Sequence, residues 1–190
     1  MPFVALWPGL EVVFENLNED SPQGDRCLMQ IFEPLGVHTV KKNGNIHIVK
    51  NQPAVSHFSS DFTACPDLMP AIAVCCAGLN ISASLTGIAT LRFKESDRVS
   101  ALVHNLRQLG YTAESFTDEL KIYPSSNRNK PEKLRIDSFD DHRIAMAFAL
   151  LAIQNKNIII DSPNVVKKSY PQFWQHLARA GFSLLEVTGV

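Results

Sequence analysis

Hydrophobic and polar residues follow two patterns along the chain, and one of them is typical of strands. In ten segments, apolar and β-branched residues recur in short runs that are bounded by polar or turn residues. The predicted strands are residues 10–16, 37–42, 45–50, 55–62, 81–87, 111–116, 119–124, 133–139, 157–162 and 182–187. Asn43-Gly44 and Thr117-Asp118 each lie between two neighbouring strands, and both pairs predict a hairpin turn.

The second pattern has helical spacing, and it predicts helices of two kinds. Residues 99–109 carry apolar side chains on one face and polar side chains between them, so this helix has a face in water. Residues 68–77 and 144–153 are apolar nearly all round, and such helices must be covered on every side. Two further helical stretches cover residues 25–36 and 171–181. These patterns predict an arrangement with the apolar helices inside and the sheets outside.

The order of these segments repeats along the chain. Gly36, Gly110 and Gly181 each end a helical stretch, and the glycines are 74 and 71 residues apart. Asp67 and Asp141 are also 74 residues apart, and alternating alanines follow each of them. The sequence therefore predicts about two and a half copies of an α/β module.

Charged residues gather where four of the predicted helices begin. They are Asp67; Lys94, Glu95 and Arg98 around the predicted N-cap Ser96; Asp141, His142 and Arg143; and Lys168 before the predicted N-cap Ser169. The helix dipole explains the acids, because it favours negative charge at an N-terminus. It disfavours the cations unless an anion binds there too, and backbone N–H groups combined with a cation make an anion site.

Each of these groups also has a structural interpretation when it is taken alone. The KESDR segment (94–98) resembles a solvated helix start, Asp67 a dipole partner, and His142 a hydrogen-bonding histidine. No second histidine stands four residues from His142, so we expect no metal site. The functional interpretation depends on the repeat, which would bring equivalent helix ends to one side of the domain.

Length and composition narrow the class of protein. The 190 residues are enough for one domain with a real core, and we expect residues 1–190 to form a single domain. The net charge of −1 argues against nucleic-acid or anionic-membrane partners, and no apolar run has the length of a membrane span. The N-terminus has no basic leader, so we expect a cytoplasmic location. The four cysteines form no CxxC pair and are interpreted as small buried hydrophobic residues.

Taken together, these segments resemble a known enzyme family. The segments PDLMPAIAV (66–74), LRFKESDR (91–98), DDHRIAMAFAL (140–150) and VKKSYPQFW (166–174) occur in the order and spacing of the 5-enolpyruvylshikimate-3-phosphate synthase family. SPQGD (21–25) also resembles the segment near the start of that family's C-terminal half. The resemblance covers nearly the whole chain from about residue 10.

For the fold, the resemblance implies an α/β (α+β) chain of repeated βαβαββ-type units. In that arrangement parallel helices are buried and sheets lie outside. A complete synthase has about twice this length and two such domains, with the active site in the cleft between them. The chain resembles the C-terminal domain alone, so the N-terminal domain is an expected partner and the chain by itself is expected to be inactive.

For the chemistry, the resemblance implies transfer of the enolpyruvyl group of phosphoenolpyruvate to the 5-hydroxyl of shikimate 3-phosphate, with release of phosphate and without metal or organic cofactor. It implies that Asp67, Lys94 and Glu95 are catalytic. Asp67 contacts the shikimate ring, Lys94 also binds shikimate 3-phosphate, and Glu95 moves a proton at the methylene carbon. It also implies that four residues bind the substrates: Arg98, His142, Arg143 and Lys168. Both substrates are anions, which would account for the cations at the helix starts.

Two other functions compete with this interpretation. A non-catalytic domain that binds phosphate esters would also need the cations, but it would gain nothing from Asp67 and Glu95. RNA-end chemistry, as in the RNA 3′-phosphate cyclase that shares the fold, would require a basic surface, and the net charge of −1 argues against it.

Overall fold

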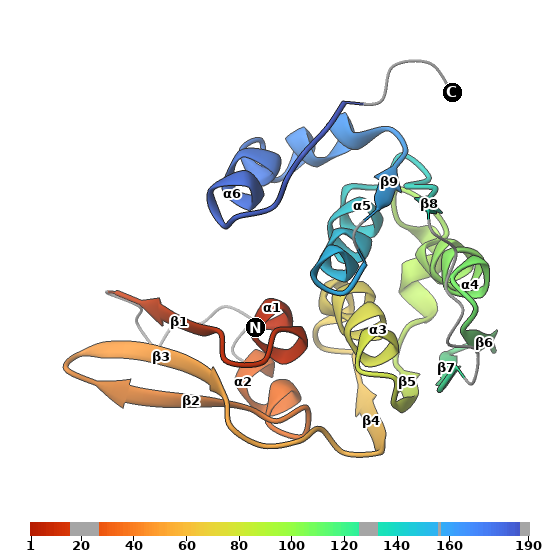
Figure 1. The fold of residues 1–190 in the computed structure, drawn as a ribbon. Coiled ribbons are helices and arrows are strands. Elements are labelled where there is room, and N and C mark those ends of the chain that lie inside the picture. Colours follow the sequence, from red (N-terminus) through yellow and green to blue (C-terminus); the bar gives the residue numbers. More distant parts are fainter. Residues whose placement is uncertain (16–26, 126–132, 156, 187–190) are drawn as a thin grey trace.

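The structure is a computed structural model that describes residues 1–15, 27–125, 133–155 and 157–186. The strands in these described ranges form three sheets (Figure 1). The first has the order β1-β3-β2 and is antiparallel, with strands β1 (Glu11–Phe14), β2 (Val37–Lys42) and β3 (Asn45–Lys50). The second has the order β4-β5-β7-β6, with strands β4 (His57–Asp61), β5 (Ser82–Thr86), β6 (Thr112–Ser115) and β7 (Glu119–Tyr123). The third pairs β8 (Leu134–Ile136) with β9 (Ile158–Ile160).

Helices connect these strands. The α-helices are α1 (Pro2–Leu6), α2 (Leu28–Phe32), α3 (Met69–Gly78), α4 (Arg98–Gln108), α5 (His142–Ala149) and α6 (Phe173–Arg179). Short 3₁₀ helices lie at several of their ends: η2 (Pro66–Leu68), η3 (Ala89–Phe93), η4 (Leu150–Ile153) and η5 (Pro163–Lys168). No helix among the described residues is long and apolar enough to cross a membrane.

The repeat predicted from the sequence is present in this order of elements. One unit runs from β4 through α3, β5 and α4 to the β6–β7 hairpin, and its first two strands are parallel. The next unit starts in the same way, with β8, α5, the parallel strand β9 and then α6. The strand predicted at 182–187 is wrong for residues 182–186, which form no strand; residue 187 lies outside the described residues. The start of the predicted helix at 25–36 and the SPQGD segment also lie outside them.

Both predicted hairpin turns are confirmed. Asn43 and Gly44 have φ angles of 53° and 78°, the left-handed conformation that matches the twist of a two-residue hairpin between β2 and β3. At the other turn the backbone N–H of Phe116 donates to the carbonyl oxygen of Glu119 at 2.7 Å and closes the β6–β7 hairpin.

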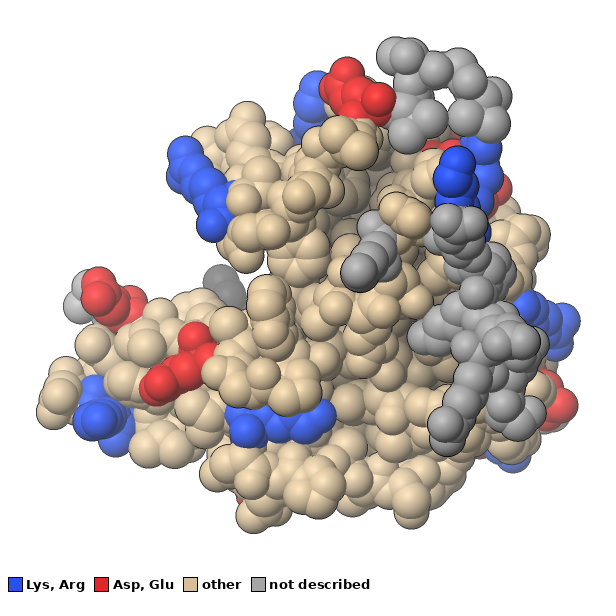
Figure 2. All heavy atoms as spheres, viewed as in Figure 1, with Lys and Arg blue, Asp and Glu red and all other residues tan. Residues whose placement is uncertain are grey.

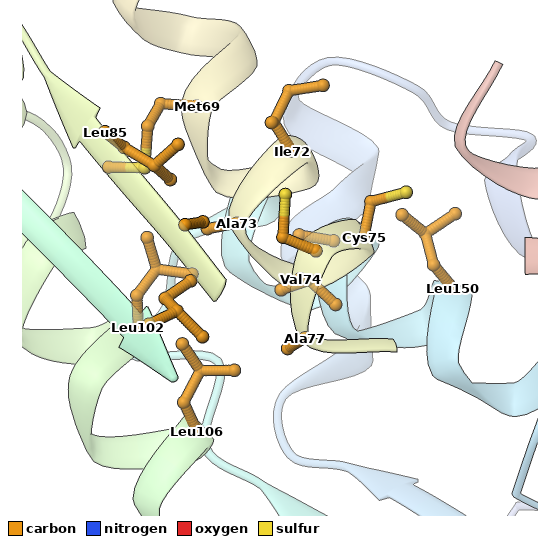
Figure 3. Packing of buried hydrophobic residues seen from close by; sticks show 14 of the residues in the cluster. Met69, Ile72, Ala73, Val74, Cys75, Ala77, Leu85, Leu102, Leu106 and Leu150 are labelled. Carbon is orange, nitrogen blue, oxygen red and sulfur yellow. The ribbon is translucent and has the colours of Figure 1, made fainter. Parts of the chain in front are cut away.

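The core lies around α3, which is apolar on all sides as the sequence predicted. Ile72, Ala73 and Val74 are fully buried, and α3 packs against both α4 and α5. Figure 3 shows Leu85 of β5 with Leu102 and Leu106 of α4 on one side of α3, and Leu150 on the other. Each such buried leucine stabilises the fold by about 1.5–3 kcal/mol. This packing holds α3, α4 and α5 side by side, with their N-terminal ends (here called their heads) at one end of the core.

Candidate functional site

Charged side chains from the heads of α3, α4 and α5 contact one another. Asp67 lies in η2, directly before α3, while Arg98 is the first residue of α4 and Arg143 lies in the first turn of α5. Arg98 Nη1 donates to Asp67 Oδ1 at 2.9 Å, and Arg143 Nη2 donates to Asp67 Oδ2 at 2.9 Å. The structure therefore brings together the three helix starts that the sequence could relate only through their spacing.

Arg98 lies at the centre of this group and is 1% exposed. Besides Asp67, its guanidinium donates to Glu95 Oε2 and, through Nε, to Asp141 Oδ2 at 2.8 Å. A guanidinium is the cation best suited to such a place, because its planar fork can serve several carboxylates at once. Three surrounding carboxylates offset the cost of burying this cation, and they fix where its N–H groups point.

Asp141 is fully buried, and the sequence did not mark it as a site residue. It caps α5 by accepting the backbone N–H of Arg143 at 2.8 Å, and it also accepts Ser96 Oγ at 3.2 Å. Because the helix dipole alone explains an acid before a helix, the sequence pattern did not indicate that Asp141 also contacts the start of α4. It is the carboxylate that joins the head of α4 to the head of α5.

The loop before Asp141 is strained and is held by Asn105 of α4. Phe139 and Asp140 have φ angles of 51° and 52°, a conformation that costs a non-glycine residue about 1–3 kcal/mol. The fully buried Asn105 side chain accepts the N–H of Asp137 at 3.0 Å and donates to its carbonyl oxygen at 2.9 Å. No sequence pattern indicated this role for Asn105.

Lys94 and Lys168 lie at the open side of the group. Lys94 Nζ is 3.9 Å from Asp67 Oδ1, and Lys168 Nζ donates to Glu95 Oε1 at 3.1 Å. Their side chains are 36% and 61% exposed, whereas that of Arg98 is 2% exposed. The cations therefore differ in exposure. Arg98 is buried, whereas water, or an anion in its place, can reach Lys94 and Lys168.

Two predictions about helix starts are wrong. Ser96 is not the N-cap of α4: Asp97 accepts the N–H of Ser100 at 3.0 Å, and Ser96 instead donates to Asp141. Lys168 is the last residue of η5 and not part of a helix start, because α6 begins only at Phe173. Arg98 and Arg143 thus lie where the helix dipole disfavours a cation, whereas Lys168 does not.

The charges of the site nearly balance. Four cations (Lys94, Arg98, Arg143 and Lys168) face three carboxylates (Asp67, Glu95 and Asp141), which leaves a net charge of +1. The pKa of Glu95 is lowered to about 2, first by a hydrogen bond from its own backbone and then by Lys168 and Arg98, while burial opposes the shift. Burial lowers the pKa of His142, so its imidazole is neutral at pH 7, and its Nδ1 is buried without a hydrogen-bond partner among the described residues.

An apolar hollow of about 190 Å³ adjoins the charged group between α1, α3, α5 and α6. Asp67 and Arg143 form its polar end, and Pro70, Met146 and Phe173 are among the residues that line the rest. Over the face in Figure 2, Lys, Arg, Asp and Glu side chains are scattered across a largely uncharged surface, so that face carries no broad field of one sign. Within the described parts of the chain, no group of three His, Cys, Asp or Glu residues is placed to hold a metal ion.

The chain matches one family model and several relatives that share a single name. The family model EPSP synthase (3-phosphoshikimate 1-carboxyvinyltransferase) matches residues 1–177. A 3-phosphoshikimate 1-carboxyvinyltransferase of Bacteroides fragilis is 37% identical over 180 residues, which are 95% of this chain and 44% of the relative. Proteins of the same name from Methanosphaerula palustris and Pyrococcus abyssi are 35% and 37% identical over 91% and 89% of the chain, and each match covers 40% of the relative.

Solved structures show the same fold. An EPSP synthase from Acinetobacter baumannii superimposes with a TM-score of 0.77 at 24% sequence identity, over 96% of this chain and 44% of that one. A second structure of the enzyme from this organism gives a TM-score of 0.74 over the whole chain. The chain thus spans less than half the length of the relatives that it matches.

Proposed function

The chain belongs to the EPSP synthase (3-phosphoshikimate 1-carboxyvinyltransferase) family, and we propose that it supplies one wall of an enolpyruvyl transfer site. The observation that carries the proposal is the group around Arg98, in which three carboxylates and three further cations meet at the heads of α3, α4 and α5. Residues 1–190 would form a single domain, and the rest of the enzyme would supply the opposite wall. The cytoplasmic location stays a prediction.

The proposed substrates, phosphoenolpyruvate and shikimate 3-phosphate, are both anions. Arg143 and Lys168 would meet phosphoenolpyruvate, and Lys94 would meet shikimate 3-phosphate; all three side chains are at least one third exposed. Arg98 would contribute through the Nη edge that Glu95 and Asp67 now occupy, so an incoming carboxylate would have to displace one of them. His142, as a neutral imidazole, would line the pocket without adding charge.

Glu95 would move the proton at the methylene carbon of phosphoenolpyruvate. With a pKa of about 2 it is a carboxylate in the free chain and therefore able to accept a proton but not to donate one. Substrate anions would compete with Glu95 for Lys168 and for the Nη edge of Arg98, which would weaken two of the causes of the low pKa. Substrate binding would thereby let Glu95 carry a proton, which it would donate to the methylene carbon during addition and take back from the resulting methyl group during elimination.

The fold supports a partner that completes this domain. In the central unit β5 is flanked by the parallel strand β4 and the hairpin strand β7. Among the described residues, β1 has only β3 beside it, and β9 has only β8. Open strand edges of this kind are sites where further strands can pair. We expect the complementary part of the enzyme to cover them.

An alternative function is binding of phosphate esters by a domain that catalyses no reaction. One observation favours it: each of the three carboxylates pairs with a cation, so positioning of the cations is by itself a reason for their presence. The two functions differ in what Glu95 does, because pure binding needs only its charge and catalysis needs its proton transfer.

A chimera tests this difference, with residues 1–190 replacing the matched segment of the Bacteroides fragilis relative. In the chimera, Glu95→Gln should lower kcat for phosphate release on the order of 100-fold or more, with a much smaller change in KM. Glu114→Gln, on strand β6 and exposed, is the matched control and should leave both unchanged. A change confined to KM would make Glu95 a binding residue and would favour the alternative.

A further inference from the structure

Two cysteines that are 38 residues apart in the sequence face each other beside the charged site. Cys27 occupies the N-cap position of α2, and Cys65 directly precedes η2. Their Sγ atoms are 3.1 Å apart, and both residues are partly exposed. The interpretation of all four cysteines as buried hydrophobic residues is therefore wrong for this pair, although it holds for Cys75 and Cys76, which are 0% exposed.

We propose that Cys27 and Cys65 are a modification site, a dithiol that low-molecular-weight disulfides oxidise to an intramolecular disulfide. A disulfide bond has a sulfur–sulfur distance of about 2.05 Å, so the two sulfurs need to approach by only about 1 Å. Partial exposure gives a small oxidant access to the pair. Cys75 and Cys76 lack this access, because both are enclosed in the core.

The reaction is thiol–disulfide exchange, and it needs no reactant other than the two protein thiols and glutathione disulfide as the oxidant. The thiolate of one cysteine attacks a sulfur of glutathione disulfide, which forms a mixed disulfide and releases one glutathione. The second cysteine then attacks the protein sulfur of this mixed disulfide, forms the Cys27–Cys65 bond and releases the second glutathione. Two protein thiols are oxidised and one glutathione disulfide is reduced to two thiols.

The bond would fasten α2 to the segment that carries Asp67. The backbone N–H of Cys65 donates to the carbonyl oxygen of Phe62 at 3.0 Å, and its own carbonyl oxygen accepts the N–H of Leu68 at 3.1 Å. Asp67 lies between these hydrogen-bonded positions and pairs with both Arg98 and Arg143. A covalent link at Cys65 would restrain this turn and reduce its local opening.

The test treats the folded chain with glutathione disulfide and then counts thiols after denaturation. We expect the count to fall from four to two, a Cys27–Cys65 linked peptide in a non-reducing digest, and slower amide hydrogen exchange at residues 65–69. Burial raises the pKa of Cys75 to about 12 and that of Cys76 well above its usual value, so both should remain thiols.

The single variants Cys27→Ser and Cys65→Ser are the controls, and each should stop at one mixed disulfide with glutathione. The proposal is overturned if wild-type chain keeps four thiols, if it accumulates glutathione adducts without the internal link, or if Cys75 or Cys76 carries the link. An internal link without slower exchange at residues 65–69 would overturn the proposed restraint.

Discussion

Removal of the charge of Asp141 alone should destabilise the chain far more than an ordinary cap substitution does. Asp141→Asn keeps the shape of the side chain and keeps one oxygen to cap α5, because asparagine is as good an N-cap as aspartate. What it removes is the anion that Arg98 Nε contacts at 2.8 Å, in a place where Asp141 is 0% and the Arg98 side chain 2% exposed. The substitution also turns an amide N–H₂ group toward one of the donors that Asp141 now accepts.

The expected loss can be worked out from these contacts. Breaking a buried ion pair by removing one partner costs about 3–5 kcal/mol. Arg98 keeps Asp67 and Glu95, and both of these are partly exposed, so the lower end applies and we expect a loss of about 3 kcal/mol in the free energy of unfolding. For a chain of this size that loss corresponds to a fall in Tm of about 6–12 °C. Urea unfolding followed by circular dichroism measures the free energy directly.

Asp97→Asn is the matched control. Asp97 caps α4 through the N–H of Ser100 at 3.0 Å, but its side chain is 39% exposed and its contact with Arg92 measures 3.5 Å. This variant should lose less than about 1 kcal/mol. Equal losses in the two variants would mean that the buried anion does not hold Arg98 in place.

Two further predictions concern pH and backbone strain. Burial lowers the pKa of His142, so the unfolded chain takes up this proton first as pH falls, and the stability that is present above about pH 6.5 is lost below it. In His142→Gln, the fall in the free energy of unfolding from pH 7 to pH 5 should therefore be smaller than in the unsubstituted chain. An equal fall in the two proteins would contradict this role of His142. Gly36 and Gly110 both have a φ of 83°, but an added Cβ would lie 2.1 Å from the carbonyl oxygen of Gln52 only at Gly36. Gly110→Ala should cost about 1–2 kcal/mol in urea unfolding and Gly36→Ala clearly more, and similar losses would show that the contact at Gln52 relaxes without cost.

Much of the fold could be predicted because it depends on local patterns. The apolar helix at α3, the one-sided helix at α4 and the turn at Asn43-Gly44 each follow from residues close together in the sequence. The strand predicted at 182–187 fails for a reason that lies outside such patterns. FSLLEV has strand-like composition, but none of its described residues pairs with a strand, and Phe182 instead packs edge-on against Phe3 and Trp7.

The site could be predicted only in part, because tertiary contacts decide its details. The spacing of the repeat indicated that Asp67, Arg98 and Arg143 belong together, and Asp67 does contact both arginines. It did not indicate that Arg98 is buried and saturated with carboxylates, since that depends on Asp141 from a segment 43 residues away. The role of Asn105 was hidden for the same reason: a polar residue inside a helix pattern gives no sign of the distant loop that it holds.

Phosphate release by the chimera decides whether residues 1–190 form one wall of an enolpyruvyl transfer site. We expect the chimera to release phosphate from phosphoenolpyruvate only when shikimate 3-phosphate is present. The chain alone and the remainder of the Bacteroides fragilis relative alone should release none, because each would hold one wall of the site. Phosphate release by the chain alone would contradict the proposed function, and so would a folded chimera that binds shikimate 3-phosphate without releasing phosphate.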